Sequence, residues 1–379
     1  MAITIAIPKE RRAAETRVAA TPETVKKFKT LGLDVVVETG AGDATKISDA
    51  DYTAAGATIA ASAAEALKNA DIVLKVRGPD ANEIGLLKRG AILAALLAPA
   101  TEKDLIAKLA EAGVVAFSME LLPRISRAQA MDVLSSQANL AGYKAVIDAA
   151  AQFGRAMPMM MTAAGTIAPA RVLVMGVGVA GLQAIATAKR LGAIVSATDV
   201  RPATKEQCES LGATFVAVID DEFKQAQTAT GYAKEMSKDY QAKQQALISE
   251  TIKKQDIVIT TALIPGRKAP VLVTEEMVKT MKPGSIIVDL AAEQGGNCPL
   301  TVANEVVERH GVTLMGYTNL PGRLAVDTSS LYARNLFNFV SLFVDKKTAD
   351  VVLNWDDEII KGAGVTRDGA VTHPAAKQA

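Results

Sequence analysis

The feature that most constrains this chain is a glycine-rich run between two β-branched segments, RVLVMGVGVAGLQAIATAKRLGAIVSATDVR, residues 171–201. Gly176, Gly178 and Gly181 have the spacing G-x-G-x-x-G, directly after a predicted strand and at the start of a predicted helix. In dinucleotide-binding domains the first glycine permits a tight turn, the second admits a pyrophosphate to the backbone, and the third lets helix and strand pack closely. The positive end of the helix faces the phosphates. The run therefore predicts a nucleotide-binding strand–turn–helix unit.

An acidic residue ends the second predicted strand of this run. Asp199 stands about 20 residues after the glycines, where a carboxylate accepts hydrogen bonds from the adenosine ribose and repels a 2′-phosphate. This position favours NAD over NADP. Arg201 favours the opposite choice, because an arginine near this position can accept a 2′-phosphate. The carboxylate carries more weight, and the sequence predicts NAD.

Short β-branched runs alternate with amphipathic or alanine-rich stretches along almost the whole chain, the pattern of parallel sheets with crossover helices. In the first third the expected strands are residues 3–8, 34–39, 71–76, 91–97 and 114–119. In the central part they are residues 171–178, 193–199, 214–218, 256–263, 285–291 and 312–318. The sequence thus predicts an α/β fold with two Rossmann-like domains, each with a mostly parallel sheet.

Two long helical patterns divide the chain. Residues 129–153 contain no proline and are interrupted only by Gly142, and residues 330–344 form the second pattern. We interpret both as helices that link the domains. Asp368-Gly369 in the tail is typical of a hairpin turn. The first domain is therefore expected to be discontinuous, with the nucleotide domain inserted in it, and the predicted bounds are 1–135 plus 325–379 for the first domain and 136–324 for the second.

Composition excludes several classes of function. Forty-two basic and 41 acidic residues give a net charge of +1, which offers no field for nucleic acid or an anionic bilayer. Two cysteines far apart fit a reducing compartment. The N-terminus lacks the charge order of a signal peptide, and the longest apolar window falls short of the roughly 18 residues that span a bilayer. We expect a soluble, cytoplasmic chain without a metal site, in which MPMMM, residues 157–161, fills the core near the domain junction.

The most polar stretch is MELLPRISRAQAMDVLSSQANLAGY, residues 119–143. It has no His or Cys, and therefore no side chain that ordinarily titrates near neutrality, among the polar residues Arg124, Arg127, Gln129, Asp132 and Ser135. One interpretation is a ligand-binding loop. The other is the polar start of the long helix, with Ser126 as its N-cap and with Asp132 and Ser135 on the surface.

A second unusual segment is residues 220–243, between the third strand of the nucleotide domain and the next helix. It exceeds the roughly 12–15 residues beyond which loops in compact domains are uncommon. It also leaves the carboxyl end of a strand, the edge at which dinucleotides bind. One interpretation is a lid with Gly231 as hinge and Tyr232 as its flat covering side chain. The other is a solvated surface insertion.

Four runs, PKERRAAETRVAATP, DIVLKVRGP, ATDVRPATKEQ and MKPGSIIVDLAAEQGGNCPLT, resemble the alanine dehydrogenase/nicotinamide nucleotide transhydrogenase family over essentially the whole chain. RISRAQAMDVLSSQANLAGYKAVIDAA and GYAKEM are similar to its transhydrogenase side, the separate NAD(H)-binding subunit of bacterial proton-translocating enzymes. The resemblance implies hydride transfer from NADH on this chain to NADP+ on a partner subunit, with proton translocation by membrane-spanning subunits. It further implies a homodimer, compatible with an apolar stripe expected to be exposed on residues 331–343, held peripherally on the cytoplasmic face of the inner membrane.

The resemblance also implies roles for individual residues. Arg124, Gln129, Asp132 and Ser135 would fix the nicotinamide end of NADH, and together with Tyr232 they are the implied catalytic residues. The further implied nucleotide contacts are Val179, Asp199, Val200, Arg201, Gly231, Gln244 and Leu263. Hydride transfer between two nicotinamide rings moves no proton between substrate and protein, so such a site needs no histidine.

The main alternative is an NAD-dependent dehydrogenase of the alanine type, which needs an acid–base group and cations for its substrate carboxylate. Arg17 and Lys75 match the family's substrate-side positions, but residues 91–101, where the resemblance places a catalytic histidine, contain none. His310 and His373 are expected on the surface. Arg17 would then pair with an acid, and Lys75 would end its strand at a charged domain interface. A third possibility is a redox-sensing module that binds NADH without turnover.

Overall fold

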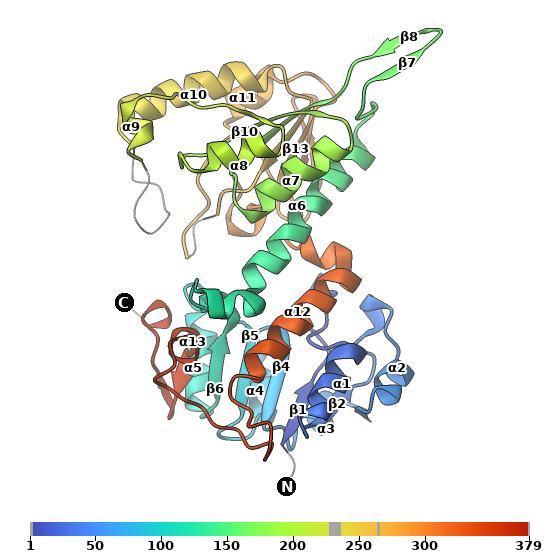
Figure 1. The fold of residues 1–379 in the computed structure, drawn as a ribbon, viewed down its shortest axis with the longest axis vertical. Helices are drawn as coiled ribbons and strands as arrows, with labels where there is room; N and C mark the ends of the chain where they lie inside the picture. The colour runs from blue at the N-terminus through green and yellow to red at the C-terminus, as the bar shows by residue number, and fades with distance from the viewer. Residues whose placement is uncertain (1–2, 227–235, 264–265, 378–379) are drawn as a thin grey trace. The chain divides into compact units, whose positions relative to one another are not determined.

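The computed structural model describes residues 3–226, 236–263 and 266–377, and the chain divides into two compact units (Figure 1). The first unit comprises Met1–Gln137 and Pro321–Ala379, and the second comprises Ala138–Leu320. The predicted divisions fell after residues 135 and 324, close to these boundaries. Each unit has its own sheet and its own core, so each is described separately.

The first unit is built on a six-stranded sheet of order β3-β2-β1-β4-β5-β6, in which every neighbouring pair is parallel. Five of these strands lie in the predicted runs. The edge strand β3 was not predicted, because its three residues are fewer than the runs that mark a strand in a sequence. The strands are β1 Thr4–Ile7, β2 Asp34–Glu38, β3 Thr58–Ala60, β4 Ile72–Arg77, β5 Ile92–Leu96 and β6 Val115–Ser118.

Helices cover both faces of this sheet, because successive residues of a strand point to opposite faces (Figure 1). Ile5 and Ile7 pack in one core with side chains of α1, α12 and α13, whereas Ala6 packs in another with side chains of α3, α4 and α5. The helices are α1 Pro22–Thr30, α2 Asp49–Ala54, α3 Ala63–Leu67, α4 Ala81–Leu86, α5 Lys103–Glu111, α12 Ala325–Val340 and α13 Glu358–Ala363, with 3-10 turns η1 Asp43–Thr45, η2 Met119–Leu121, η3 Ser126–Met131, η5 Pro321–Leu324 and η6 Pro374–Ala376.

The C-terminal part of the chain completes the first unit. Tyr332, Leu336 and Phe339 of α12 are fully buried in its core. The expectation of an exposed apolar stripe on this helix is therefore wrong, because the stripe packs against the unit's own sheet. The predicted tail hairpin is confirmed: Asp368 and Gly369 take positive φ angles of 51° and 77° and join β16 Thr366–Arg367 to β17 Ala370–Val371.

The second unit is built on a seven-stranded mixed sheet of order β11-β10-β9-β12-β13-β15-β14. Its six parallel strands lie in the predicted runs. The antiparallel edge strand β14 was not predicted, because most of its residues are exposed and leave no buried apolar pattern. The strands are β9 Arg171–Met175, β10 Ile194–Thr198, β11 Thr214–Phe215, β12 Ile257–Thr260, β13 Ile286–Asp289, β14 Val306–Arg309 and β15 Val312–Met315.

The second sheet also has a core on each face. Val172 and Val174 of β9 pack with α6, α7 and α8, and Leu173 and Met175 pack with α10 and α11. A Cβ atom on Gly142 of α6 would collide with the carbonyl oxygen of Ala180 in α7, so glycine permits this close helix approach. The helices are α6 Val133–Gln152, α7 Val179–Arg190, α8 Thr204–Ser210, α9 Asp221–Lys224, α10 Lys238–Ile252 and α11 Glu275–Thr280, with the 3-10 turn η4 Ala292–Gln294.

Residues 220–243 are helical at both ends, so their interpretation as one long loop is wrong there. α9 occupies the start and α10 begins at Lys238. Phe223 and Tyr240 stack with ring centroids 6.4 Å apart and form a small core between these helices. Gly231 and Tyr232 lie outside the described residues. Among the helices that are described, none is both long and apolar enough to cross a membrane.

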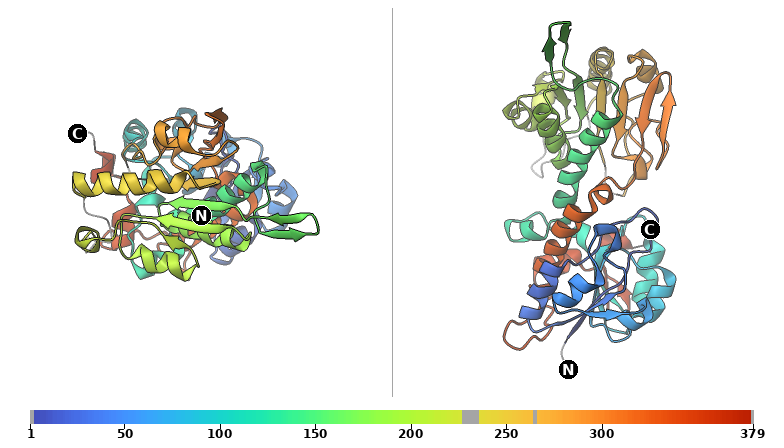
Figure 2. Two further views of the ribbon diagram at one scale, coloured as in Figure 1. Left: turned by 90° about the horizontal axis from the view of Figure 1, so that it is seen from above. Right: turned by 90° about the vertical axis from the view of Figure 1, so that its right-hand side faces the viewer.

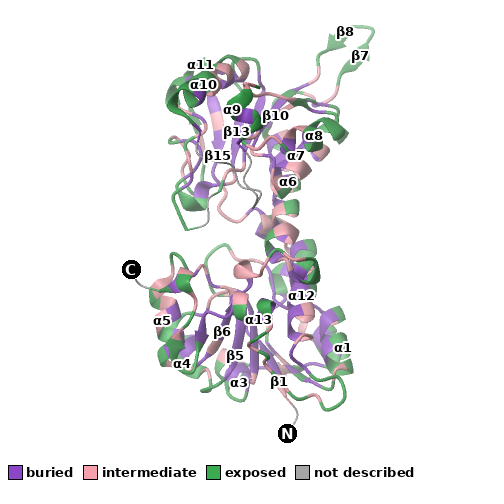
Figure 3. Ribbon diagram, turned by 60° about the vertical axis from the view of Figure 1, so that its left-hand side comes forward, coloured by how far each residue is buried: buried purple, intermediate pink, exposed green. Residues whose placement is uncertain are grey.

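A two-stranded hairpin extends away from the body of the second unit (Figures 1 and 2). Its strands are β7 Met160–Thr162 and β8 Gly165–Ile167, and every residue in them is exposed (Figure 3). The run MPMMM leads into it. Met157 is buried, but Met161 is 78% exposed. The interpretation of this run as core packing is therefore wrong for its last three methionines, which present an apolar surface to solvent.

Candidate functional site

The glycine turn of the second unit has the geometry that its spacing predicts. β9 ends at Met175, and Gly176 follows with a positive φ of 103°, which a residue with a side chain adopts only with strain. A Cβ atom on Gly176 would lie 2.5 Å from the Thr261 hydroxyl, and one on Gly181 would collide with the Gly176 carbonyl oxygen. The first glycine thus makes the turn, and the third allows α7 to lie against it.

The second glycine of the motif faces open space. Gly178 is the N-cap of α7, and among the described residues no atom lies within 4 Å of where its Cβ would stand. The first N–H groups of an α-helix have no partner inside the helix and carry its positive dipole end. Space beside the backbone and unpaired donors together suit a pyrophosphate. The residues present therefore fit a dinucleotide at this turn.

The strand order places this turn at the edge where α/β sheets bind ligands. β9 lies between β10 and β12, so the chain leaves β9 toward one side of the sheet and later returns on the other. Ligands of open α/β sheets bind at the carboxyl ends of strands beside such a switch point. Val179, Val200 and Leu263 follow the ends of β9, β10 and β12, and each is at least 40% exposed. Apolar side chains thus lie exposed near the glycine turn.

Asp199 is bound on two sides. Its Oδ2 accepts a hydrogen bond of 2.7 Å from the Val177 N–H, which ties the end of β10 to the glycine turn. Arg201 donates from Nε and Nη2 to the two carboxylate oxygens, each at 2.9 Å. This pairing raises the pKa of Arg201. The carboxylate is nearly buried while Arg201 stays about one-third exposed, so the acid rather than the arginine is the fixed member of the pair.

Gln244 of α10 reaches the same edge. Its Nε2 donates to the Thr198 hydroxyl at the end of β10 at 3.1 Å, and its Oε1 accepts from the Val218 N–H at 2.9 Å. The structure thus brings together most of the residues proposed to bind the nucleotide in the second unit, namely Gly176, Gly178, Val179, Gly181, Asp199, Val200, Arg201, Gln244 and Leu263.

The polar run lies in the first unit and differs in detail from both sequence interpretations. Residues up to Met131 form the 3-10 turn η3, and α6 begins at Val133 rather than at Gln129. Asp132 separates the two and accepts a 2.9 Å hydrogen bond from the Ser135 N–H, while the Ser135 hydroxyl donates to the same carboxylate. Asp132, not Ser126, therefore caps the long helix. Arg124 and Gln129 have exposed side chains.

The substrate-side cations of the alternative function are held by acids within the first unit. Arg17 is 3% exposed and donates to both carboxylate oxygens of Glu15, as predicted for a structural pair. Lys75 is buried in the middle of β4, so its expected position at a strand end is wrong. Its Nζ lies 2.9 Å from Glu83 and 3.8 Å from Glu10.

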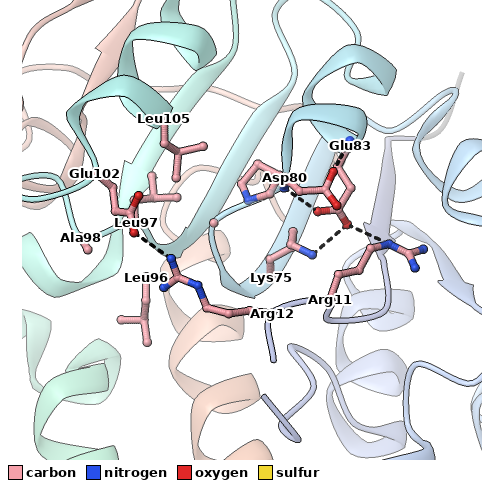
Figure 4. Close-up of a pocket in the computed structure, with 12 residues that line it drawn as sticks. Arg11, Arg12, Lys75, Asp80, Glu83, Leu96, Leu97, Ala98, Glu102 and Leu105 are labelled. Carbon is pink, nitrogen blue, oxygen red and sulfur yellow. Dashed lines mark hydrogen bonds and ion pairs between the residues drawn. The ribbon is translucent and has the colours of Figure 1, made fainter. Parts of the chain in front are cut away.

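A cavity of about 250 Å³ opens beside Lys75 (Figure 4). Arg11 and Arg12 also line it, and Figure 4 shows their ion pairs with Glu83 and Glu102. Each of these basic residues thus has an acidic partner, and a small anion entering the cavity would have to compete with carboxylates already bound. Among the described residues no group of three or more His, Cys, Asp or Glu side chains could hold a metal ion.

Glu10 gives this cluster a pH dependence. Burial raises the pKa of Glu10 to about 7, while the nearby Lys75 lowers it in part. Between the ordinary glutamate pKa of 4.5 and about 7, the folded state binds a proton that the unfolded state lacks. Stability should therefore rise as pH falls from about 8 to about 5, by at most about 3 kcal/mol.

Urea unfolding of the wild type and the Glu10→Gln variant at these pH values tests this, followed by the fluorescence of Trp355, the single tryptophan. Because Trp355 packs against the core of the first unit, its signal reports that unit. Glu10→Gln should lose the pH-dependent increment, whereas Glu102→Gln, which changes an exposed acid, should retain it. An equal pH slope in wild type and Glu10→Gln would contradict the assignment.

Three polar residues of the second unit were missed by the sequence interpretation. Thr261, Asp289 and Asn297 lie at the carboxyl ends of β12 and β13, and Asp289 and Asn297 are completely buried. The only signal for them in the sequence is an acid at the end of a buried strand and an asparagine after a glycine pair. Such a pattern does not show which backbone groups these side chains bind.

Comparison with known proteins places this geometry in a family. The family model described as "Alanine dehydrogenase/PNT, C-terminal domain" matches residues 145–374, and the N-terminal domain model of the same family matches residues 6–141. The chain is 58% identical over 376 residues to an NAD(P) transhydrogenase subunit alpha chain of Rhodospirillum rubrum, covering 98% of each chain.

Two further relatives define its place within the family. A crystal structure of transhydrogenase from Sinorhizobium meliloti superposes with a TM-score of 0.89 at 53% identity, covering 97% of this chain and 100% of that one. Alanine dehydrogenase of Methanococcus maripaludis is more distant, at 32% identity over 99% of this chain and 96% of its own. The chain therefore belongs to the alanine dehydrogenase/PNT family and, within it, to the NAD(P) transhydrogenase alpha subunits.

Proposed function

We propose that this chain is the NAD(H)-binding component of a proton-translocating NAD(P) transhydrogenase, which passes a hydride from NADH to NADP+ held on a partner subunit. The observation that carries the proposal is the glycine turn, where Gly178 leaves space for a pyrophosphate and Asp199 stands at the neighbouring strand end. The identity of 58% to a transhydrogenase alpha subunit across 98% of both chains supports the same function.

The chain's residues have binding and orienting roles in this proposal. When bound, reduced nicotinamide supplies the hydride, which moves from C4 of one ring to C4 of the other without a proton leaving or entering the protein. The N-terminal turn of α7 holds the pyrophosphate, and Asp199 accepts from the adenosine ribose. On the family resemblance we assign Arg124, Gln129, Asp132 and Ser135 to the nicotinamide half. Their task is to hold the ring in a reactive geometry and exclude water.

The partners follow from the same proposal. NADP(H) is bound by a second subunit, and further subunits span the membrane, so this chain acts at the cytoplasmic face of the inner membrane. The exposed methionines of the β7–β8 hairpin, Met159 to Met161, together with Ile167, offer an apolar surface for a second copy of the chain. A homodimer through this surface replaces the one expected through α12.

Amino-acid oxidation is the less favoured function. An alanine-type dehydrogenase needs free cations for the substrate carboxylate and an acid–base group near the reacting carbon. Arg17 is paired with Glu15, and Lys75 with Glu83, in a buried setting where removing either acid would leave an uncompensated charge. His310 lies on the surface beside Glu275, and His373 caps the turn η6.

Three assays on the purified chain test the proposed function. We expect it to bind NADH, to produce no NADH from alanine and NAD+, and to transfer hydride once a separately prepared NADP-binding domain and NADP+ are added. Formation of NADH from alanine would identify a dehydrogenase. NADH binding without transfer to the added partner domain would favour the redox-sensing alternative.

A further inference from the structure

A buried carboxylate gathers the loop that follows β13. Asp289, the last residue of that strand, is completely buried. Its oxygens accept hydrogen bonds from the backbone N–H groups of Ala291, Asn297 and Cys298 and from the hydroxyls of Thr260 and Thr301, at 2.8–3.2 Å. Charge-assisted bonds of this kind are stronger than neutral ones. Asp289 therefore fixes the backbone position of Asn297.

The Asn297 side chain in turn holds the segment that follows β12. Its Oδ1 accepts from the Ala262 N–H at 3.1 Å, and its Nδ2 donates to the carbonyl oxygens of Ala262 at 2.9 Å and Pro270 at 2.8 Å. The side chain is completely buried, so water does not compete for these bonds. Ala262 precedes Leu263, an exposed apolar residue of the proposed nucleotide site.

The same segment supports the glycine turn. The Thr261 hydroxyl donates to the Gly176 carbonyl oxygen at 3.0 Å, and the Thr261 N–H donates to the Met175 carbonyl oxygen at 2.9 Å. The hydroxyl lies 2.5 Å from where a Gly176 Cβ would stand, so the turn rests directly on Thr261. A continuous path of hydrogen bonds thus runs from Asp289 through Asn297 and residues 261–262 to the turn.

We propose that Asn297 and Thr261 are positioning residues for NAD(H). Asn297, fixed by Asp289, sets the backbone of residues 261–263, and Thr261 sets the height of the glycine turn against it. This inference rests on the proposed function, because the turn is taken to hold the pyrophosphate. Neither side chain needs to touch the nucleotide. Their effect is on where the turn and Leu263 stand when it binds.

The experiment measures the NADH dissociation constant and the melting temperature of matched variants of the full chain. Asn297→Ala should weaken NADH binding by about 10- to 100-fold, because a misplaced binding group costs that much. Thr261→Val, which keeps the shape and removes the hydroxyl, should weaken it about 10-fold, and Thr261→Ser should restore it. The pair separates the hydrogen bond from the side-chain volume.

A control at the opposite end of the same strand separates positioning from general stability. Asp256, just before β12, accepts from Arg155, Lys282 and the Arg171 N–H. Asp256→Ala should lower the melting temperature yet leave the NADH dissociation constant within about two-fold of the wild type. Equal weakening by Asp256→Ala and Asn297→Ala would overturn the inference, as would unchanged NADH binding in folded Asn297→Ala.

The outcomes also distinguish this inference from the proposed function. If Asn297→Ala does not fold, the Thr261 pair decides: recovery of NADH affinity in Thr261→Ser supports the inference, and equal affinity in the wild type, Thr261→Val and Thr261→Ser overturns it. A wild-type chain that binds no NADH would instead overturn the proposed function itself.

Discussion

Asp199→Asn is expected to reverse much of the preference of this chain for NADH over NADPH. The native carboxylate repels a 2′-phosphate and holds Arg201 through two hydrogen bonds. The amide removes the charge and releases the arginine, which then becomes available to the phosphate. The ratio of the NADPH to the NADH dissociation constant should fall about 100-fold, or about 2.7 kcal/mol. Calorimetric titration with each nucleotide measures it.

Two further variants identify the cause. The double variant Asp199→Asn/Arg201→Ala should lose the gained NADPH affinity, because the released arginine supplies it. Glu209→Gln removes an exposed acid from α8 in the same unit and should leave the preference unchanged. If Asp199→Asn keeps its preference within about two-fold of the wild type, the carboxylate does not select the nucleotide.

Gly181→Ala is expected to abolish tight NADH binding and to destabilise the second unit. The added methyl group would overlap the Gly176 carbonyl oxygen, so α7 must move away from the turn. This displacement separates the helix N-terminus from the pyrophosphate, and NADH affinity should fall by about 100-fold or more. The melting temperature should fall as well, because a close backbone contact is replaced by a clash. Titration with NADH and thermal unfolding measure the two effects.

The other glycines of the unit provide the controls. Gly178→Ala meets no described atom within 4 Å, so it should fold with an unchanged melting temperature and still weaken NADH, because the methyl group enters space needed by the ligand. Gly154→Ala, also without described neighbours within 4 Å, should change neither quantity. Equal NADH affinity in Gly181→Ala and Gly154→Ala would contradict the role given to the turn.

Periodicity and glycine spacing predict most of the fold. Strands buried on both faces have apolar runs that stand out in the sequence, and the motif at residues 176–181 has one physically sensible conformation. The edge strands β3 and β14 and the β7–β8 hairpin were missed, because short or exposed strands bury too little apolar surface to leave a pattern. The methionines at residues 159–161 were assigned to the core since hydrophobicity by itself does not distinguish a core from an interaction surface.

The nucleotide site was predictable in part for the same reason. Gly176 and Asp199 act through backbone geometry that is local in the sequence, so spacing identifies them. Asn297 and Thr261 act through bonds to residues that are distant in sequence or on another strand, and only the folded sheet brings these groups together. The cap at Asp132 was missed because two turns of different kinds meet there, and periodicity cannot locate that junction.

The central claim is that the chain presents NADH for direct transfer to a nucleotide on another subunit. The most direct measurement uses NADH deuterated at the transferring position of C4, mixed with this chain, its NADP-binding partner and NADP+. Direct transfer predicts that the deuterium is recovered in NADPH and that none is released to water. Deuterium in the solvent, or NADPH that carries only solvent hydrogen at C4, would contradict it.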